Sequence, residues 1–237
     1  MSETPAQSLD YCTDLLRRED EDRWLAAQYA KSSLQDVLIG HGAMRLEFRR
    51  IPAQVSEAPL GEMRLQWWRE RLEGLAAGVP PRAHPVLEAL APTLAGRNIT
   101  RLDGVIDACS RPLYDEAFSS VEELAGWLME SEGAMDAFVV ELLGGDTDLT
   151  DAVMKAGAAY AMAREGRFLA QNFDGEIGVR AASLYAEAAP VLRKATLELT
   201  PAFLHLTLTP FYLQVRDRVA PVRKRIRLFS AMAFGRF

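Results

Sequence analysis

Residues Leu60–Leu72 read LGEMRLQWWRERL, and this stretch decides the fold that we expect for the chain. On an α-helix its apolar residues recur at steps of three and four and so share one face, made of Leu60, Met63, Trp67 and Leu75. Trp68 and Leu72 lie at the edges of that face, and the charged residues point elsewhere. The pattern predicts an amphipathic helix that turns this apolar face to the core.

The two adjacent tryptophans of this stretch allow two interpretations. Trp67 and Trp68 have Arg64, Arg69 and Arg71 close by in the sequence. In the first interpretation the tryptophans belong to the core and the arginines are solvated. In the second they form the wall of a pocket that holds a large apolar ligand with an anionic head.

Length and composition are those of an ordinary globular protein. The chain has 237 residues, of which 49% are hydrophobic and 25% charged, so we expect one domain spanning residues 1–237, with a loose tail at residues 1–10. The tail holds no basic segment followed by an apolar one, which favours a cytoplasmic protein. Cys12 and Cys109 are far apart and outside any CxxC pattern, so we expect free thiols.

Apolar residues recur at helical rather than alternating spacing throughout the chain, which predicts an all-α fold of about eight to ten helices. Pro52 predicts a break in the segment Ile51–Ala58, before the tryptophan helix. The residues Ser119–Glu123 read SSVEE and predict a capping box. We expect Thr147 or Thr150 to cap the helix that follows Gly145.

The charge is unevenly distributed. The net charge is −6, yet residues 216–237 carry many basic side chains against Asp217 alone. The acidic remainder argues against a nucleic-acid partner. The basic segment alternates with apolar residues, so it is either a docked terminal helix or an amphipathic segment on an anionic membrane surface. In the second case the membrane-contacting residues would be Arg223, Lys224, Arg225, Arg227 and Phe229.

Sequence motifs for metal or nucleotide chemistry are missing. His41, His84 and His205 are widely separated and none lies in an HExxH pattern, so we expect no histidine metal site. The chain has no Walker loop, GxGxxG or GxSxG motif. The acidic run at residues 19–22 either complements a helix dipole or binds a metal, and we expect the structural role.

Several segments resemble the squalene/phytoene synthase family over roughly residues 22–169. They are FRRIPAQVSE (Phe48–Glu57), GEMRLQWWRERLEG (Gly61–Gly74), the connector Gly78–Val86, and the segments Asp115–Gly145 and Ala156–Leu169. The resemblance implies an isoprenoid-synthase-like helical bundle. Active members join two prenyl diphosphates head to head, and two Asp-rich motifs hold the Mg²⁺ that neutralises the leaving diphosphate.

The chain departs from the family at both Asp-rich motifs. The first motif should fall at residues 49–57, where Pro52, Ala53 and Ser56 replace aspartates and only Glu57 is acidic. The second should fall near Arg164, where Glu165 and Leu169 stand. The segment IPAQVSEAPLGEMRLQWWRE is similar to that of a subgroup with degraded motifs, which includes an assembly factor of mitochondrial respiratory complex I.

Three hypotheses follow from the sequence. The first is a non-catalytic member that binds lipid at the inner face of the membrane or assembles a respiratory complex, with no cofactor. The second is a Mg²⁺-dependent prenyl transferase that uses Arg49 and Arg164 for diphosphate and Glu57 and Glu165 for metal. The third is a plain helical interaction module. The partners expected under the first are a prenyl or lipid ligand, an anionic membrane surface and respiratory complex subunits. The ligand-binding candidates are Arg49, Glu57, Arg64, Trp67, Trp68, Arg164 and Glu165.

Overall fold

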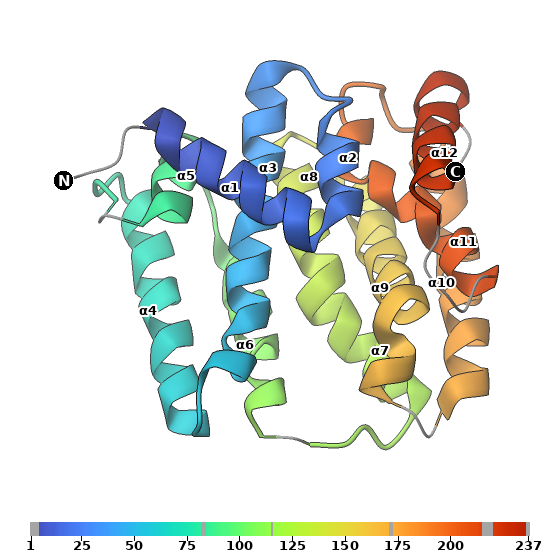
Figure 1. Cartoon of the computed structure of the whole chain (residues 1–237), viewed down its shortest axis with the longest axis horizontal. Helices are drawn as coiled ribbons and strands as arrows, with labels where there is room; N and C mark the ends of the chain where they lie inside the picture. Colours follow the sequence, from blue (N-terminus) through green and yellow to red (C-terminus); the bar gives the residue numbers. More distant parts are fainter. Residues whose placement is uncertain (1–4, 82–83, 115, 171–172, 215–219, 236–237) are drawn as a thin grey trace. The chain divides into compact units, whose positions relative to one another are not determined.

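A computed structural model describes residues 5–81, 84–114, 116–170, 173–214 and 220–235. Within these ranges every regular element is helical (Figure 1), which confirms the predicted all-α class. The labels run to α12, beyond the eight to ten helices expected, because short segments such as the seven-residue α2 and the six-residue α11 are separate helices. None of the described helices is long and apolar enough to cross a bilayer.

The chain divides into two compact units, Met1–Glu116 and Ala117–Phe237, and the expectation of a single domain remains a prediction. Unit 1 contains α1 (Pro5–Glu19), α2 (Glu21–Ala27), α3 (Ser32–Arg50), η1 (Pro52–Gln54), α4 (Ala58–Ala76), α5 (Pro85–Leu94), α6 (Thr100–Ala108) and η2 (Arg111–Leu113). Unit 2 contains α7 (Val121–Leu128), η3 (Met129–Gly133), α8 (Ala134–Leu142), α9 (Thr147–Leu169), α10 (Asp174–Leu192), η5 (Thr200–Ala202), η6 (Leu204–Leu208), α11 (Thr209–Gln214) and α12 (Pro221–Phe234).

The beginning of the chain is more ordered than predicted. Residues 5–10, expected to be part of a loose tail, form the first turns of α1, and residues 1–4 lie outside the described ranges. In unit 1 α1 packs against both α3 and α5 (Figure 1). The buried Ser8 hydroxyl donates a hydrogen bond to the Glu88 carboxylate, so this part of the tail is tied to α5. The first helix therefore begins earlier than the expected tail boundary at residue 10.

The tryptophan helix exists as α4, but of the face predicted to be buried only Leu75 is buried. Leu60, Met63 and Trp67 are exposed at 47%, 69% and 37%. The buried residues are Gly61, Leu65, Trp68, Leu72 and Leu75. The reason lies at Gly61, where an added Cβ would meet the Leu113 side chain at 2.2 Å. Leu113 therefore lies directly on the helix backbone, and this contact turns the Gly61 face inward.

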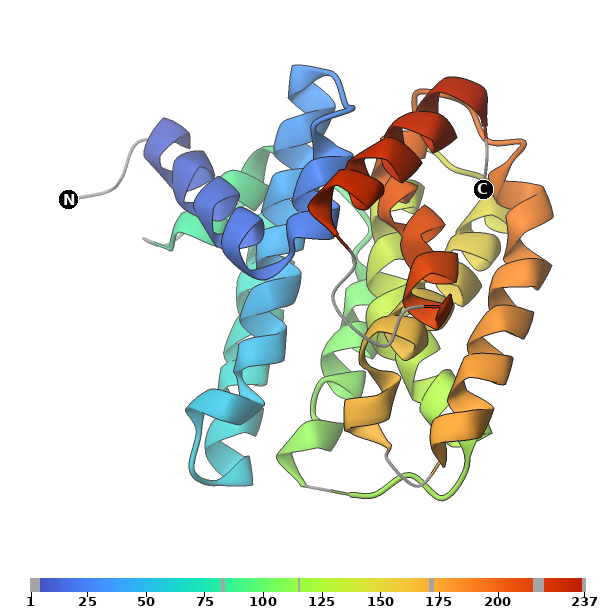
Figure 2. The ribbon, with the colours of Figure 1, turned by 45° about the vertical axis from the view of Figure 1, so that its right-hand side comes forward.

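Unit 2 is organised around α9, which packs against α7, η3, α8, α10 and α11. Figure 2 shows this helix among its neighbours in the yellow-to-red half of the chain. Three small residues on one side of α9, Val153, Ala156 and Ala159, are fully buried. Small side chains let helix backbones approach closely, and that closeness allows one helix to serve as the centre of the unit.

Helix starts were predicted with mixed success. Ser120 caps α7, because its hydroxyl accepts a hydrogen bond from the Glu123 backbone N–H at 3.1 Å. The Glu123 carboxylate accepts one in return from the Ser119 backbone N–H at 2.7 Å, so the reciprocal bond of the predicted capping box goes to the residue before the cap. The cap of α9 is Asp146 and not Thr147 or Thr150, since its carboxylate accepts from the Leu149 N–H at 2.8 Å.

Candidate functional site

The break between α3 and α4 produces a hollow in unit 1. Pro52 ends the α3 ladder and starts the short turn η1, after which the chain runs extended to Glu57. The hollow has a volume of about 550 Å³, which lies within the range of small-molecule pockets. It is lined by Glu47, Ile51, Gln54, Val55, Ser56, Leu60, Met63, Arg64, Trp67 and Trp68.

One wall of the hollow is aromatic. The rings of Trp67 and Trp68 meet edge to face at 5.3 Å, and Phe48 packs on Trp68 at 5.4 Å. The His84 ring also packs on Trp68, with 5.1 Å between the ring centres. Burial lowers the pKa of His84, against the smaller opposing effects of Glu47 and Glu88, which favours a neutral imidazole beside the tryptophans. The wall is therefore an apolar surface suited to a hydrocarbon chain.

The polar groups of the hollow are held by neighbouring side chains. The guanidinium of Arg64 donates to the side-chain oxygen of Gln54 at 3.1 Å. Glu47 lies 3.2 Å from Arg50, which also binds Glu19. Arg64 is thus the one cation among the described lining residues, and it shares the lining with the polar side chains of Glu47, Gln54 and Ser56. An anionic head group would find its partner here, with its apolar chain against Trp67.

Two other residues predicted for this site lie elsewhere in unit 1. Arg49 is an exposed residue of the last turn of α3, and Glu57 is exposed at the start of α4. Neither lines the hollow. Glu57 precedes the first turn of α4 without capping it through its side chain. The structure therefore brings together Arg64, Trp67 and Trp68 of the predicted set, while their role in binding remains a prediction.

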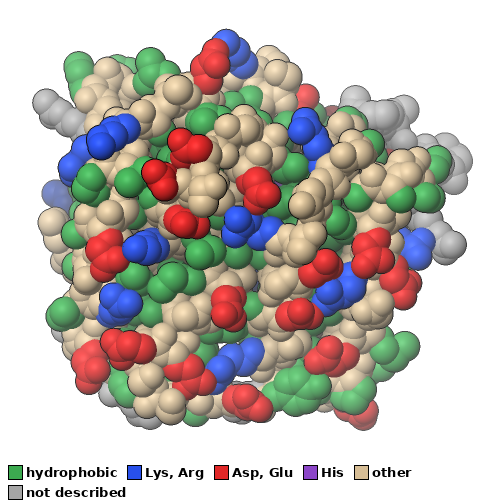
Figure 3. Space-filling view, turned by 180° about the vertical axis from the view of Figure 1, so that it is seen from behind, with side chains coloured by type: hydrophobic (Ala, Val, Ile, Leu, Met, Phe, Trp, Pro, Cys, Tyr) green, Lys and Arg blue, Asp and Glu red, His purple; other side chains and the backbone are tan. Residues whose placement is uncertain are grey.

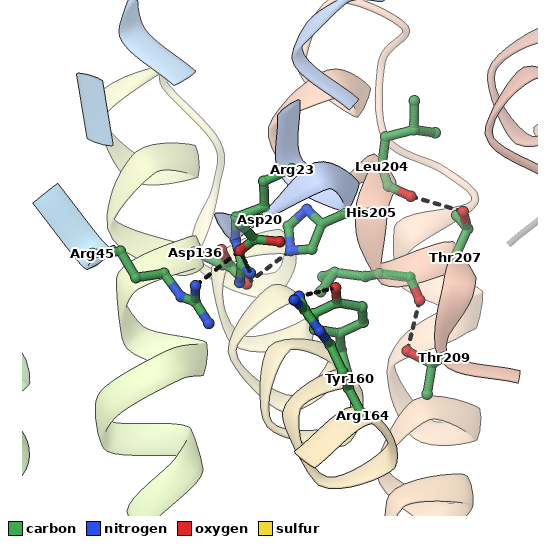
Figure 4. Close-up of polar contacts among 11 residues, drawn as sticks. Asp20, Arg23, Arg45, Asp136, Tyr160, Arg164, Leu204, His205, Thr207 and Thr209 are labelled. Atoms are coloured by element: carbon green, nitrogen blue, oxygen red, sulfur yellow. Dashed lines mark hydrogen bonds and ion pairs between the residues drawn. The ribbon is translucent and has the colours of Figure 1, made fainter. Parts of the chain in front are cut away.

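The remaining predicted residues, Arg164 and Glu165, belong to α9 in unit 2. The Arg164 guanidinium donates to the Tyr160 hydroxyl at 2.8 Å and lies 3.7 Å from the Glu165 carboxylate. Tyr160 is buried, and its ring meets His205 edge to face at 5.2 Å. Figure 4 shows Arg164 turned toward this tyrosine. Both predicted residues therefore take part in contacts within unit 2.

A buried acid–base pair continues this polar cluster. His205 Nε2 lies 3.2 Å from Asp136 Oδ2, and both side chains are almost fully buried (Figure 4). Gly157 of α9 lies close to this pair, since a Cβ there would stand 3.1 Å from the Asp136 carboxylate and 2.8 Å from the Gly133 Cα. Sequence reasoning missed the pair because 69 positions separate its members. The available signal was a lone Asp and a lone His, each inside an apolar run.

The acidic run at residues 19–22 has a structural role in unit 1. Asp20 is fully buried, and its Oδ2 accepts hydrogen bonds at 2.9 Å from both Arg23 and Arg45 (Figure 4). One carboxylate thus joins α2 to α3 through two guanidinium groups. The run also stands where the expected dipole role places it, at a helix start, although the helix is α2 and not the first: Asp20 is the N-cap of α2, and Glu21 and Asp22 lie in its first turn.

The described residues do not fit a Mg²⁺ cluster. Mg²⁺ requires several oxygen ligands in near-octahedral geometry. Within the described ranges no three His, Cys, Asp or Glu side chains lie close enough together to hold a metal ion. Glu57 is exposed, and Glu165 lies beside the positive charge of Arg164. A carboxylate beside a cation is a weaker metal ligand than one facing another carboxylate, so these two residues are poor substitutes for the Asp-rich motifs.

Comparisons with known proteins agree on one relationship. A sequence model of the squalene/phytoene synthase family matches residues 16–172. Assembly factor 6 of NADH dehydrogenase (ubiquinone) complex I from Mus musculus is 29% identical over 136 residues, and that of Homo sapiens is 26% identical. The matched region covers 56% of this chain and only 40% of either relative.

A solved structure extends the fold comparison to nearly the whole chain. The crystal structure of a dehydrosqualene synthase in complex with ligand superposes with a TM-score of 0.72. The match covers 97% of both chains at 14% sequence identity. At so low an identity the likeness establishes the isoprenoid-synthase fold, and residue roles have to be argued from this chain's own side chains.

Proposed function

Because this chain belongs to the squalene/phytoene synthase family, we propose that it keeps the family fold without metal-dependent prenyl transfer and acts as an assembly factor for respiratory complex I. In this role it would work at the inner face of the membrane by binding. The proposal assigns no cofactor. It also assigns no nucleic-acid partner, in line with the acidic composition of residues 1–215.

The observation that carries the proposal is the arrangement of Glu57 and Glu165. Prenyl transfer needs Mg²⁺ to neutralise the diphosphate as it leaves, and the metal needs converging carboxylates. Glu57 is exposed at the start of α4, and Glu165 lies beside Arg164. A loss of several kcal/mol of charge stabilisation corresponds to several powers of ten in rate, at about 1.4 kcal/mol per tenfold. An enzyme with these residues would be very slow.

The names of the relatives support the assembly role in this proposal. The proteins of Mus musculus and Homo sapiens that match this chain are named as assembly factors of complex I. This chain spans less than half of their length. The family model spans residues 16–172, which include the tryptophan helix and α9. We infer that this part supplies the contacts with respiratory complex subunits.

The hollow beside Trp67 and Trp68 supports a ligand-binding role. Its aromatic wall suits a prenyl or lipid chain, and Arg64 suits an anionic head group, while the Glu47 carboxylate of the same lining is paired with Arg50. Binding there would not require a metal, since one guanidinium replaces the cation at the head group. A bound lipid would in turn help to keep the assembly factor at the inner face of the membrane.

The test has two measurements on the full chain. The first is diphosphate release from farnesyl diphosphate, with and without Mg²⁺, where we expect none. Mg²⁺-dependent release would contradict the proposal and establish a prenyl transferase that uses Glu57 and Glu165. The second is the amount of assembled complex I after deletion of the gene in the source organism. We expect a clear loss, and an unchanged amount would refute the assembly role.

A further inference from the structure

Helix α12 is attached to unit 2 by one of its faces. Leu228 and Ala231 are fully buried, and the helix packs against η6. The Arg227 side chain donates from Nε to the Thr207 carbonyl oxygen at 3.0 Å. The Lys224 Nζ lies 6.0 Å from the centre of the Tyr212 ring. These contacts place α12 as a formed helix on the surface of unit 2 (Figure 2).

The opposite face of α12 is apolar and exposed. Val222, Ile226 and Phe229 are exposed at 66%, 63% and 59%. They follow at steps of four and three residues, so at about 100° per residue they lie within about 60° of one another. The same geometry puts them on the far side of the helix from Leu228 and Ala231. Single exposed apolar residues are common, whereas an aligned row on one helix marks an interaction surface.

Positive charge flanks this apolar row on both sides. Arg223 and Arg225 are exposed and lie on either side of the row when the helix is viewed along its axis. The segment Pro221–Phe234 contains no Asp or Glu. Elsewhere the charges are mixed, and Figure 3 shows Asp and Glu among Lys and Arg on one face of the molecule. The exposed face of α12 therefore differs from the rest of this acidic protein in being both apolar and purely basic in its charged residues.

We propose that α12 lies in the plane of an anionic lipid bilayer. Val222, Ile226 and Phe229 enter the boundary between head groups and acyl chains, and Arg223 and Arg225 bind lipid phosphates. An apolar face flanked by basic residues is the pattern of helices that bind the membrane interface. Lipid phosphate supplies the negative charge that this face of α12 lacks, and the acyl region supplies the apolar partner.

Of the residues predicted to contact a membrane, some face outward on α12 and others contact the protein. Of the five, Arg223, Arg225 and Phe229 are exposed on the outer side of α12. Arg227 and Lys224 contact η6 and Tyr212 and are directed to the protein. Residues 215–219 and 236–237 of the basic segment lie outside the described ranges. The inference deepens the proposed function, on which it rests for the reason that the protein meets a membrane.

Flotation of the full chain with lipid vesicles tests the proposal. One vesicle type is phosphatidylcholine alone, and the other is an equal mixture of phosphatidylcholine and phosphatidylglycerol. We expect binding to the mixture only, weakened by added salt because exposed charges are screened. Binding to neither vesicle type, or equally to both, would overturn the proposal.

Two variants separate the contributions of charge and apolar contact. R223Q/R225Q should weaken binding to the mixed vesicles about thirtyfold, at about 1 kcal/mol for each basic residue near the surface. I226S/F229S should weaken it by at least about tenfold through lost apolar burial. All four residues are exposed or outward-facing, so folding should be retained, and far-UV circular dichroism checks this.

Matched control variants lie elsewhere on the surface. R97Q removes one exposed arginine from unit 1, and V179S removes an apolar side chain that is 72% exposed on α10. Both should bind vesicles like the wild type, and a loss in either would overturn the assignment to α12. If the wild-type chain binds the mixed vesicles but deletion of its gene leaves complex I unchanged, only the assembly role is refuted. If the chain does not bind vesicles but deletion lowers the amount of complex I, only the membrane role is refuted.

Discussion

Gly133→Ala should destabilise unit 2, because Gly133 is where a π-helical turn touches α9. A Cβ on Gly133 would lie 2.1 Å from the Met154 carbonyl oxygen and 2.9 Å from its carbonyl carbon. Ordinary contacts of a Cβ are 3.4–4 Å, so the two backbones must separate by more than an ångström. Overpacking of this kind costs typically about 1–3 kcal/mol. The contact is with backbone, which cannot rotate away, so we expect at least about 2 kcal/mol.

Gly126→Ala is the matched control for this prediction. Gly126 lies inside α7, and a Cβ there would meet nothing within 4 Å. This variant should be neutral or up to about 1 kcal/mol more stable, since alanine favours the helix. Urea and thermal unfolding of both variants measure the difference. Gly133→Ala should lower Tm by roughly 4–8 °C. Equal stability of the two variants would refute the close contact between η3 and α9.

Three further predictions concern titration, reactivity and capping. Burial lowers the pKa of His41 from 6.5 to about 4. As the pH falls, His41 takes up a proton in the unfolded chain before it does so in the folded protein. The stability gained from neutral His41 is therefore complete above pH 6.5 and is lost as the pH falls toward 4. Urea unfolding across that window should show a decline of about 3 kcal/mol, absent in His41→Leu. Burial also raises the pKa of the Cys12 thiol to about 12, so iodoacetamide at neutral pH should label the half-buried Cys109 well before Cys12, as mass spectrometry would show. Asp146→Ala should cost about 1 kcal/mol in urea unfolding through loss of the α9 cap, and an unchanged midpoint would contradict that role.

The helical class of this chain was predictable, whereas the orientation of α4 was not. Spacing of three and four residues recurs along the chain and is sufficient for an all-α prediction. In α4, however, two overlapping apolar rows satisfy the same spacing, one through Trp67 and one through Trp68. The choice between them depends on the contact of Leu113 with Gly61, about fifty positions away in the sequence. Local periodicity carries no information about such a contact.

Only those parts of the candidate site that are close together in the sequence were predictable. The tryptophans and Arg64 are neighbours in the sequence, and Pro52 indicates the break that opens the hollow. Their shared pocket wall therefore follows from local pattern. The pair of Asp136 and His205 depends on the packing of η6 beside α8 and α9, which no spacing rule provides.

Complementation of a deletion strain tests whether this chain supports complex I assembly without metal-binding carboxylates. The measurement is the amount of assembled complex I in cells that carry either the wild-type chain or Glu57→Gln with Glu165→Gln. Glutamine keeps the size of both side chains and removes the charges that a metal would need. We expect both chains to restore complex I equally. Restoration by the wild type alone would show that carboxylate chemistry is required, and restoration by neither would contradict the assembly role.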